Sequence, residues 1–162
     1  MLAPRHLLPY IFLMKIFLLF CLCIVVIADL NAQSAFVRSY GGSGVEWANG
    51  IARSGDGGYV MVGATFSGDG DFTGMRKGEC DAWVIKCRED GSVQWKRIIG
   101  GSKYDNMLAV ISTSDAGYMV CGNSYSNDGD VAGMNKGSSD ILITKLDASG
   151  TIQWVKLYGG SA

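Results

Sequence analysis

Short apolar runs separated by turn-forming residues dominate the chain from residue 41 onward. The first four runs are residues 47–53, 59–66, 82–87 and 93–99. Tight turns rich in glycine and aspartate follow the first and third runs, and a longer polar loop, residues 67–80, follows the second. No window keeps a period of 3.6 over the roughly ten or more residues that a helix needs. The pattern therefore predicts four antiparallel β-strands joined by turns.

The repeated glycine, aspartate, lysine and tryptophan positions recur 59 residues later without a change of register, and the four apolar runs recur with them. The equivalent runs are residues 107–113, 118–125, 141–146 and 152–158. Self-similarity at one fixed period marks a repeat architecture, in which each unit buries its faces against its neighbours. Four antiparallel strands in ~40–60 residues form the blade of a β-propeller. The predicted fold class is therefore all-β, with two four-stranded antiparallel blades in tandem that make up part of a propeller.

The repeat register also predicts where the segments of the chain begin and end. Residues 33–40 are predicted to form a lone outer strand, because Phe36 lies one period before a tryptophan of the first repeat. Blade repeats follow at residues 41–99 and 100–158, and residues 159–162 match the start of a third repeat. Propellers have ~4–8 blades, so two blades fill only part of a ring. The sequence is interpreted as a fragment of a longer protein, or alternatively as a short chain that assembles with itself.

The N-terminal segment, residues 1–32, has the pattern of a secretory signal peptide. Lys15 precedes thirteen uncharged residues, 16–28, and small residues before Gln33 provide a cleavage site. Met14 is a plausible true start. A permanent anchor is the alternative, but a span takes ~20 apolar residues. We therefore expect cleavage and a mature chain without a membrane span, located in the extracellular space or at the outer membrane and cell surface.

Composition narrows the classes of function. A formal net charge of −1 gives no indication of a nucleic-acid partner. The one histidine, His6, lies in the predicted signal peptide, so the mature chain lacks the imidazole of Ser-His-Asp and Cys-His sites and of histidine-containing zinc sites. The mature chain keeps Cys80, Cys87 and Cys121. We interpret them as small buried hydrophobic residues, since apolar residues stand at the equivalents of Cys87 and Cys121.

Both copies share the pattern GGS…D-x-G-Y…D-G-D…K-G…D…K…G-x-x-x-W. This pattern covers nearly all of residues 33–162 and resembles repeats in long, secreted cell-surface proteins of Bacteroidetes-type bacteria. Those proteins often end in a sorting domain for export across the outer membrane. The resemblance implies a propeller fold, secretion and a surface location, and it implies no established activity.

Trp95 and Trp154 each follow a glycine by four residues in the last hairpin of a repeat. This hairpin is similar to the tryptophan-docking motif of pyrroloquinoline-quinone dehydrogenase propellers, although its turn is one residue shorter. The resemblance implies that the tryptophans pack between blades, and it carries no quinone site across. Large aromatic side chains bury ~150–250 Å² each. We predict inter-blade packing for Trp95 and Trp154, and for the repeated tyrosines Tyr59 and Tyr118.

The repeated Asp-Gly-Asp loops contain the candidate metal ligands. Their carboxylates are Asp69, Asp71, Asp128 and Asp130. Carboxylate oxygens on a tight turn suit calcium, although a closing glutamate and a third spaced acidic ligand are missing. Aspartate and glycine are also ordinary turn residues, so calcium binding and turn stabilisation both stay open. Lys86, which recurs as Lys145, is expected to be a solvated strand residue whose stem covers apolar surface. No catalytic residue and no other cofactor is predicted.

Two classes of function remain. The first is a secreted, non-catalytic module that binds a glycan or protein at the cell surface, or that spaces other domains, with further blades or other copies as partners. The second is a fragment of a propeller enzyme, a hydrolase or a quinone-dependent oxidoreductase, whose active site lies outside this chain. The repeated aspartates favour the first class, because a single catalytic centre needs residues that differ between blades.

Overall fold

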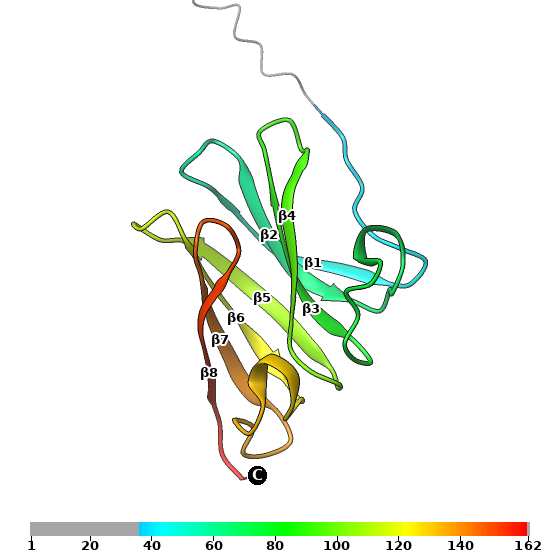
Figure 1. Ribbon diagram of the computed structural model, residues 1–162, viewed down its shortest axis with the longest axis vertical. Coiled ribbons are helices and arrows are strands. Elements are labelled where there is room, and N and C mark those ends of the chain that lie inside the picture. The colour runs from blue at the N-terminus through cyan, green and yellow to red at the C-terminus, as the bar shows by residue number, and fades with distance from the viewer. Residues whose placement is uncertain (1–35, 162) are drawn as a thin grey trace, which may run out of the picture. The chain divides into compact units, whose positions relative to one another are not determined.

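The computed structural model describes residues 36–161, so the predicted signal peptide at residues 1–32 lies outside the described residues. Residues 36–161 form two four-stranded antiparallel sheets, each with its strands in sequence order (Figure 1). The first sheet consists of β1 (Glu46–Arg53), β2 (Tyr59–Thr65), β3 (Asp81–Cys87) and β4 (Val93–Ile99). The second consists of β5 (Asp105–Ser112), β6 (Tyr118–Ser124), β7 (Asp140–Leu146) and β8 (Ile152–Tyr158). The predicted all-β class with two tandem four-stranded units is confirmed, and the described residues contain no α-helix.

The strands coincide closely with the predicted apolar runs. β4 and β8 have the predicted bounds, whereas β5 begins two residues before its run, at Asp105. In each repeat the first strand has an irregularity at one position, between Ala48 and Gly50 and between Met107 and Ala109. The repeat in the sequence is therefore a repeat in the backbone, including its bulge.

Each long loop contains a short 3-10 turn that the hydrophobic pattern did not predict. These turns, η1 (Gly70–Phe72) and η2 (Gly129–Val131), include the second aspartate of each Asp-Gly-Asp motif. Gly70 and Gly129 have φ angles of 56° and 61°. A Cβ on Gly70 would overlap the carbonyl oxygen of Gly41. Glycine is thus needed here both for the left-handed backbone and for the close approach.

Alternation along the strands gives each sheet two faces. The side chains of residues paired directly across strands lie on the same face. In the first sheet, face A has Val60, Val62, Ala82, Val84 and Ile99, and face B has Tyr59, Met61, Trp83, Ile85 and Cys87. The residues 59 positions later define faces A and B of the second sheet.

Face A of the first sheet packs against face B of the second. One core cluster joins Val60, Val62 and Val84 to Tyr118 and Leu142, all of them at most 2% exposed. The inner strands approach so closely that a Cβ on Gly50 would lie 3.2 Å from the carbonyl oxygen of Leu108. The contact is head-to-tail, since unlike faces meet. It leaves face B of the first sheet and face A of the second directed away from the contact.

Residues 36–40 do not form the predicted lone strand, because no strand is assigned before Glu46 in the described residues. A strand needs a hydrogen-bonded neighbour, and the three strands that would precede this segment are not part of residues 36–161. The segment instead lies against face B of the first sheet. A Cβ on Gly91 would overlap the Phe36 ring, and the Tyr40 hydroxyl donates to the carbonyl oxygen of Gly91.

Candidate functional site

The candidate calcium ligands of the first repeat hold their loop to the start of the repeat. The backbone N–H of Ser43 donates to Asp69 Oδ1 at 2.8 Å, and the N–H of Gly41 donates to Asp71 Oδ2 at 3.0 Å. In return, the N–H of Asp71 donates to the Gly41 carbonyl at 2.9 Å. The hydrogen bond from Ser43 lowers the pKa of Asp69, because it favours the charged carboxylate.

The second repeat duplicates these bonds. Ser102 N–H donates to Asp128 Oδ1 at 2.7 Å, and Gly100 N–H donates to Asp130 Oδ2 at 3.1 Å. The pKa of Asp128 is lowered by its bond from Ser102, as that of Asp69 is by Ser43. The Asp-Gly-Asp motif thus acts twice as a clamp between the long loop and the Gly-Gly-Ser segment.

Lysines approach the second aspartate of each Asp-Gly-Asp motif. Lys96 Nζ lies 3.5 Å from Asp71 Oδ1, and Lys77 Nζ forms an ion pair with Asp130. Within residues 36–161, no three or more His, Cys, Asp or Glu side chains are grouped so that they could hold a metal ion. The structure therefore places the four aspartates on backbone amides and lysines, and it does not gather them into a ligand set for calcium.

Asp81 and Asp140 begin the third strand of each repeat and are buried, at 0% and 2% exposed. The N–H groups of Lys77 and Gly78 donate to Asp81 Oδ2 at 3.0 and 3.3 Å. The N–H of Lys136 donates to Asp140 Oδ2 at 2.9 Å. Burial raises the pKa of Asp81. The Oδ1 atom of each aspartate has no hydrogen-bond partner among the described residues.

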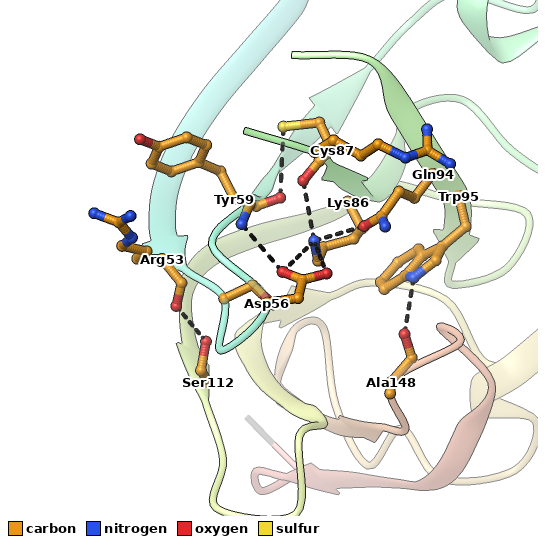
Figure 2. A network of polar contacts seen from close by, with 12 residues as sticks. Arg53, Asp56, Tyr59, Lys86, Cys87, Gln94, Trp95, Ser112 and Ala148 are labelled. Atoms are coloured by element: carbon orange, nitrogen blue, oxygen red, sulfur yellow. Dashed lines mark hydrogen bonds and ion pairs between the residues drawn. The ribbon is translucent and has the colours of Figure 1, made fainter. Parts of the chain in front are cut away.

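A buried lysine forms the most densely bonded polar cluster (Figure 2). Lys86 is 2% exposed, and its Nζ donates to both oxygens of Asp56 at 2.9 Å. It also donates to the Cys87 carbonyl at 3.0 Å and to Gln94 Oε1 at 2.6 Å. The hydrogen bond from Lys86 lowers the pKa of Asp56 to about 2. The expectation of a solvated Lys86 is therefore wrong, because the ammonium group is held inside the sheet contact by Asp56.

Lys145 repeats this arrangement in the second sheet. Its Nζ donates to Asp115 Oδ1 at 2.9 Å, to Thr113 Oγ1 at 3.0 Å and to the Leu146 carbonyl at 3.2 Å. The pKa of Asp115 is lowered, first by this hydrogen bond from Lys145. Both lysine Nζ atoms are engaged as donors to carboxylate and carbonyl oxygens, so neither lysine is placed as a nucleophile or base. The sequence does contain an indication of these ion pairs, because Asp56 and Lys86 recur together, 59 residues later, as Asp115 and Lys145.

Trp95 bridges the two sheets. Its Nε1 donates to the Ala148 carbonyl at 3.0 Å, and a Cβ on Gly150 would lie 2.7 Å from its ring (Figure 2). Its ring centroid lies 5.8 Å from that of Tyr118. The predicted packing residues therefore divide into two groups. Trp95 and Tyr118 lie in the contact between the sheets, whereas Tyr59 and Trp154 lie on the two faces outside it.

Hydroxyl groups also form hydrogen bonds across the contact between the sheets. The hydroxyls of Ser54 and Tyr118 lie 2.6 Å apart, and Ser112 Oγ donates to the Arg53 carbonyl at 2.6 Å. Cys80, Cys87 and Cys121 form no disulfide. Cys80 and Cys87 are at most 2% exposed, as expected for small buried residues, whereas Cys121 is partly exposed. Burial raises the pKa of Cys80 to about 11, which disfavours its reactive thiolate.

An apolar cleft of ≈ 390 Å³ lies on face B of the first sheet, beneath residues 36–40. Its lining includes Phe36, Ile51, Tyr59, Met61 and Cys87. Such a cleft can accept apolar groups, but it contains no acid–base pair and no polar cluster. The repeated Asp-Gly-Asp carboxylates and the pairs of Lys86 with Asp56 and Lys145 with Asp115 are thus engaged in holding loops and turns in place.

No helix within residues 36–161 is long and apolar enough to cross a membrane. No protein-family model matches the chain, and no curated protein matches it.

Proposed function

We propose that the chain is a secreted, non-catalytic β-propeller module that binds a glycan or protein ligand at the cell surface through its long loops. The head-to-tail stacking of the sheets supports the propeller. Each sheet presents face A to face B of the next, and a heterologous contact repeated with a fixed rotation generates a ring when the rotation closes. A ring of such sheets places the equivalent loops of all repeats on one side.

The observation that carries the binding role is a shared loop frame with divergent exposed residues. Both long loops keep the same clamp from the Asp-Gly-Asp motif and the same bond to the third-strand aspartate. The exposed positions differ between the copies: Gly68 against Asn127, Thr73 against Ala132 and Glu79 against Ser138. Binding residues are commonly found on loops that a rigid scaffold positions. A fixed frame with variable exposed residues is the arrangement that a binding surface uses.

The test is a binding measurement with the labelled chain on an array of bacterial-surface and host glycans and on purified surface proteins. The loop variant combines Glu79→Ala, Asn127→Ala and Ser138→Ala, which leaves all clamp residues in place. We expect the wild-type chain to bind a defined ligand class and the loop variant to lose at least tenfold in affinity.

The matched control variant changes exposed positions at the opposite end of the sheets. It combines Arg88→Ala and Ser114→Ala, in the hairpins after β3 and β5. This variant should bind as the wild type does. Equal losses from both variants, or turnover of a substrate by the wild-type chain, would argue against a loop-borne, non-catalytic binding role.

A further inference from the structure

The two outward faces are the repeat equivalents of the two faces that are buried against each other. On face B of the first sheet, Ile51 is 64% exposed, whereas its equivalent Val110, under the first sheet, is 8% exposed. Tyr59 lines the open cleft, whereas its equivalent Tyr118 is 2% exposed. Trp83 and Ile85 on the same face are at most 5% exposed, because they lie in a core cluster with Phe72 against which Tyr40 and Met75 pack. The exposed part of face B is therefore the region around Ile51 and Tyr59, and its residues are apolar like those that the first sheet covers on the second.

Face A of the second sheet shows the complementary difference. Ile141 is 56% exposed, whereas its equivalent Ala82 is 0% exposed. Cys121 is partly exposed, whereas its equivalent Val62 is fully buried. Trp154 is 37% exposed. The Trp95 ring lies against Gly150 of the next sheet, whereas no glycine of the described residues is placed in this way against Trp154. Exposed apolar surface of this extent marks an interaction site.

The packing of Trp95 between the two sheets indicates which side chain would fit on the outward faces. Trp95 packs over Gly150, which has a φ of 81°, and against the Tyr118 ring. On the outward face of the first sheet, the equivalent receiving pair is Gly91, with a φ of 77°, and Tyr59. Trp154 is the repeat equivalent of Trp95, so Trp154 of another copy has the side chain that would pack against Gly91 and Tyr59.

Charge complementarity points to the same partner. Lys77 of the first repeat pairs with Asp130 of the second. Their equivalents are Lys136, which is exposed on the second repeat, and Asp71, which is partly exposed on the first and has Lys96 Nζ 3.5 Å from its Oδ1. Two hydrogen bonds are not duplicated. Leu108 is the equivalent of Asn49, which donates across the sheets to Asn106 and the Met107 carbonyl. Arg53 is the equivalent of Ser112, whose hydroxyl donates across the sheets to a backbone carbonyl. Leu108 would make an apolar contact instead.

We propose that the chain associates head-to-tail with a second copy of itself. Face A of the second sheet of one copy docks on face B of the first sheet of the next. Trp154 then lies on Gly91 and Tyr59, and Lys136 approaches Asp71. Because unlike faces meet, a pair of copies still has one open face of each kind, to which further copies can bind.

Residues 36–40 occupy part of this receiving face. Phe36 lies one period before Trp95 and covers Gly91 as Trp95 covers Gly150. The segment is therefore an internal substitute for the last strand of a neighbouring sheet. A second copy must displace it, so association is expected to be reversible and to depend on concentration.

This inference rests on the same stacking as the proposed propeller and does not depend on ligand binding by the loops. The two proposals can therefore fail separately. An association experiment tests the faces, and the array experiment tests the loops.

The experiment uses two variants that each block one face at an exposed position. Ile141→Arg blocks face A of the second sheet, and Ile51→Arg blocks face B of the first. Sedimentation velocity over a range of concentrations should show oligomers for the wild type and monomers for each variant alone. A mixture of the two variants should form dimers and nothing larger, because each variant keeps one intact face.

Ser114→Arg is the matched control, since it adds the same charge at an exposed turn. At the equivalent Gly55, an added Cβ would meet no atom within 4 Å, so a side chain at this position of the turn points away from the contact between sheets. The control should associate as the wild type does. Monomeric wild-type chain at all concentrations, or a mixture of the two variants that stays monomeric, would overturn the proposal.

A second measurement needs no substitution. Cys121 lies on face A of the second sheet and is partly exposed, whereas Cys80 and Cys87 are buried. Thiol labelling located by peptide mass mapping should slow at Cys121 as the wild-type concentration rises. Labelling at Cys121 that is independent of concentration would contradict docking at this face, even if a variant failed to fold.

Discussion

At the scale of single residues, Lys86 shows how a charged strand position becomes part of a core. Its neighbours across the strands are Val60 and Trp95, and the second sheet covers its face. An ammonium group buried there is tolerated only if its hydrogen-bonding capacity is satisfied. Asp56, the Cys87 carbonyl and Gln94 satisfy it. The turn that contains Asp56 is thereby fixed to the middle of the sheet.

We predict that Asp56→Asn lowers the free energy of unfolding by about 1–2 kcal/mol. Removing one partner leaves a buried ammonium group without its counter-charge, which costs about 3–5 kcal/mol in a fully buried pair. The loss is smaller here because the Asp56 side chain is 49% exposed. Urea denaturation of the full chain followed by tryptophan fluorescence measures it. The double variant Lys86→Met with Asp56→Asn should recover part of the loss.

The pH dependence provides the control for this pair. The pKa of folded Asp56 is lowered to about 2 from its ordinary 3.8, so the stabilisation is present above pH 3.8 and is lost as the pH falls through about 2. The difference in stability between the wild type and Asp56→Asn should therefore shrink across this interval. A difference that stayed constant down to pH 2 would show that the ion pair is not its source.

At the scale of elements, the strands were predictable because two copies of one pattern had to satisfy the same alternation and the same turns. The loops were less predictable. The Asp-Gly-Asp motif suits both a cation and a clamp, and its role is decided by Gly41 and Ser43, which lie in a segment distant in sequence. Residues 36–40 carry a strand-like pattern, but a strand exists only where a neighbour accepts its hydrogen bonds. Burial of Lys86 likewise depends on the second sheet, which strand periodicity does not describe.

We predict that Gly150→Ala destabilises the chain more than Gly133→Ala does. Both glycines have positive φ angles, 81° and 71°, so both substitutions carry a similar backbone cost of about 1 kcal/mol. A Cβ at residue 150 would lie 2.7 Å from the Trp95 ring, whereas nothing lies within 4 Å of a Cβ at residue 133. Overpacking should add about 1–3 kcal/mol at residue 150. Urea denaturation of both variants measures the difference.

The Trp95→Ala background tests whether this extra loss comes from the sheet contact. Without the indole ring, the two alanine substitutions should become similar in effect, because residues in contact are energetically coupled. If the difference persisted without the indole ring, strain within the hairpin itself would be its source.

At the scale of the whole described region, the two sheets form one contact, and the two faces that could form the same contact with further sheets are partly exposed. The first sheet supplies face A and the second supplies face B, and the unused faces are also apolar and keep the positions of the Lys77–Asp130 pair. On the proposed head-to-tail stacking, the repeat itself would specify the neighbours of each sheet. The exposed positions of the long loops can then differ between repeats, because the residues that stabilise the loops are the same in both repeats.

The last prediction concerns competition for the receiving face. Phe36 covers Gly91 in the isolated chain, and Trp154 of a second copy is proposed to take the same place. Phe36→Ala removes the internal occupant and should tighten head-to-tail association by about tenfold, roughly the effect of 1.4 kcal/mol. Trp154→Ala removes the incoming ring and should weaken association, with most of the loss in the dissociation rate. Sedimentation equilibrium gives both association constants, and circular dichroism shows whether each variant is folded. Substitutions that merely loosened the fold would shift association in one direction, so opposite shifts identify a shared site.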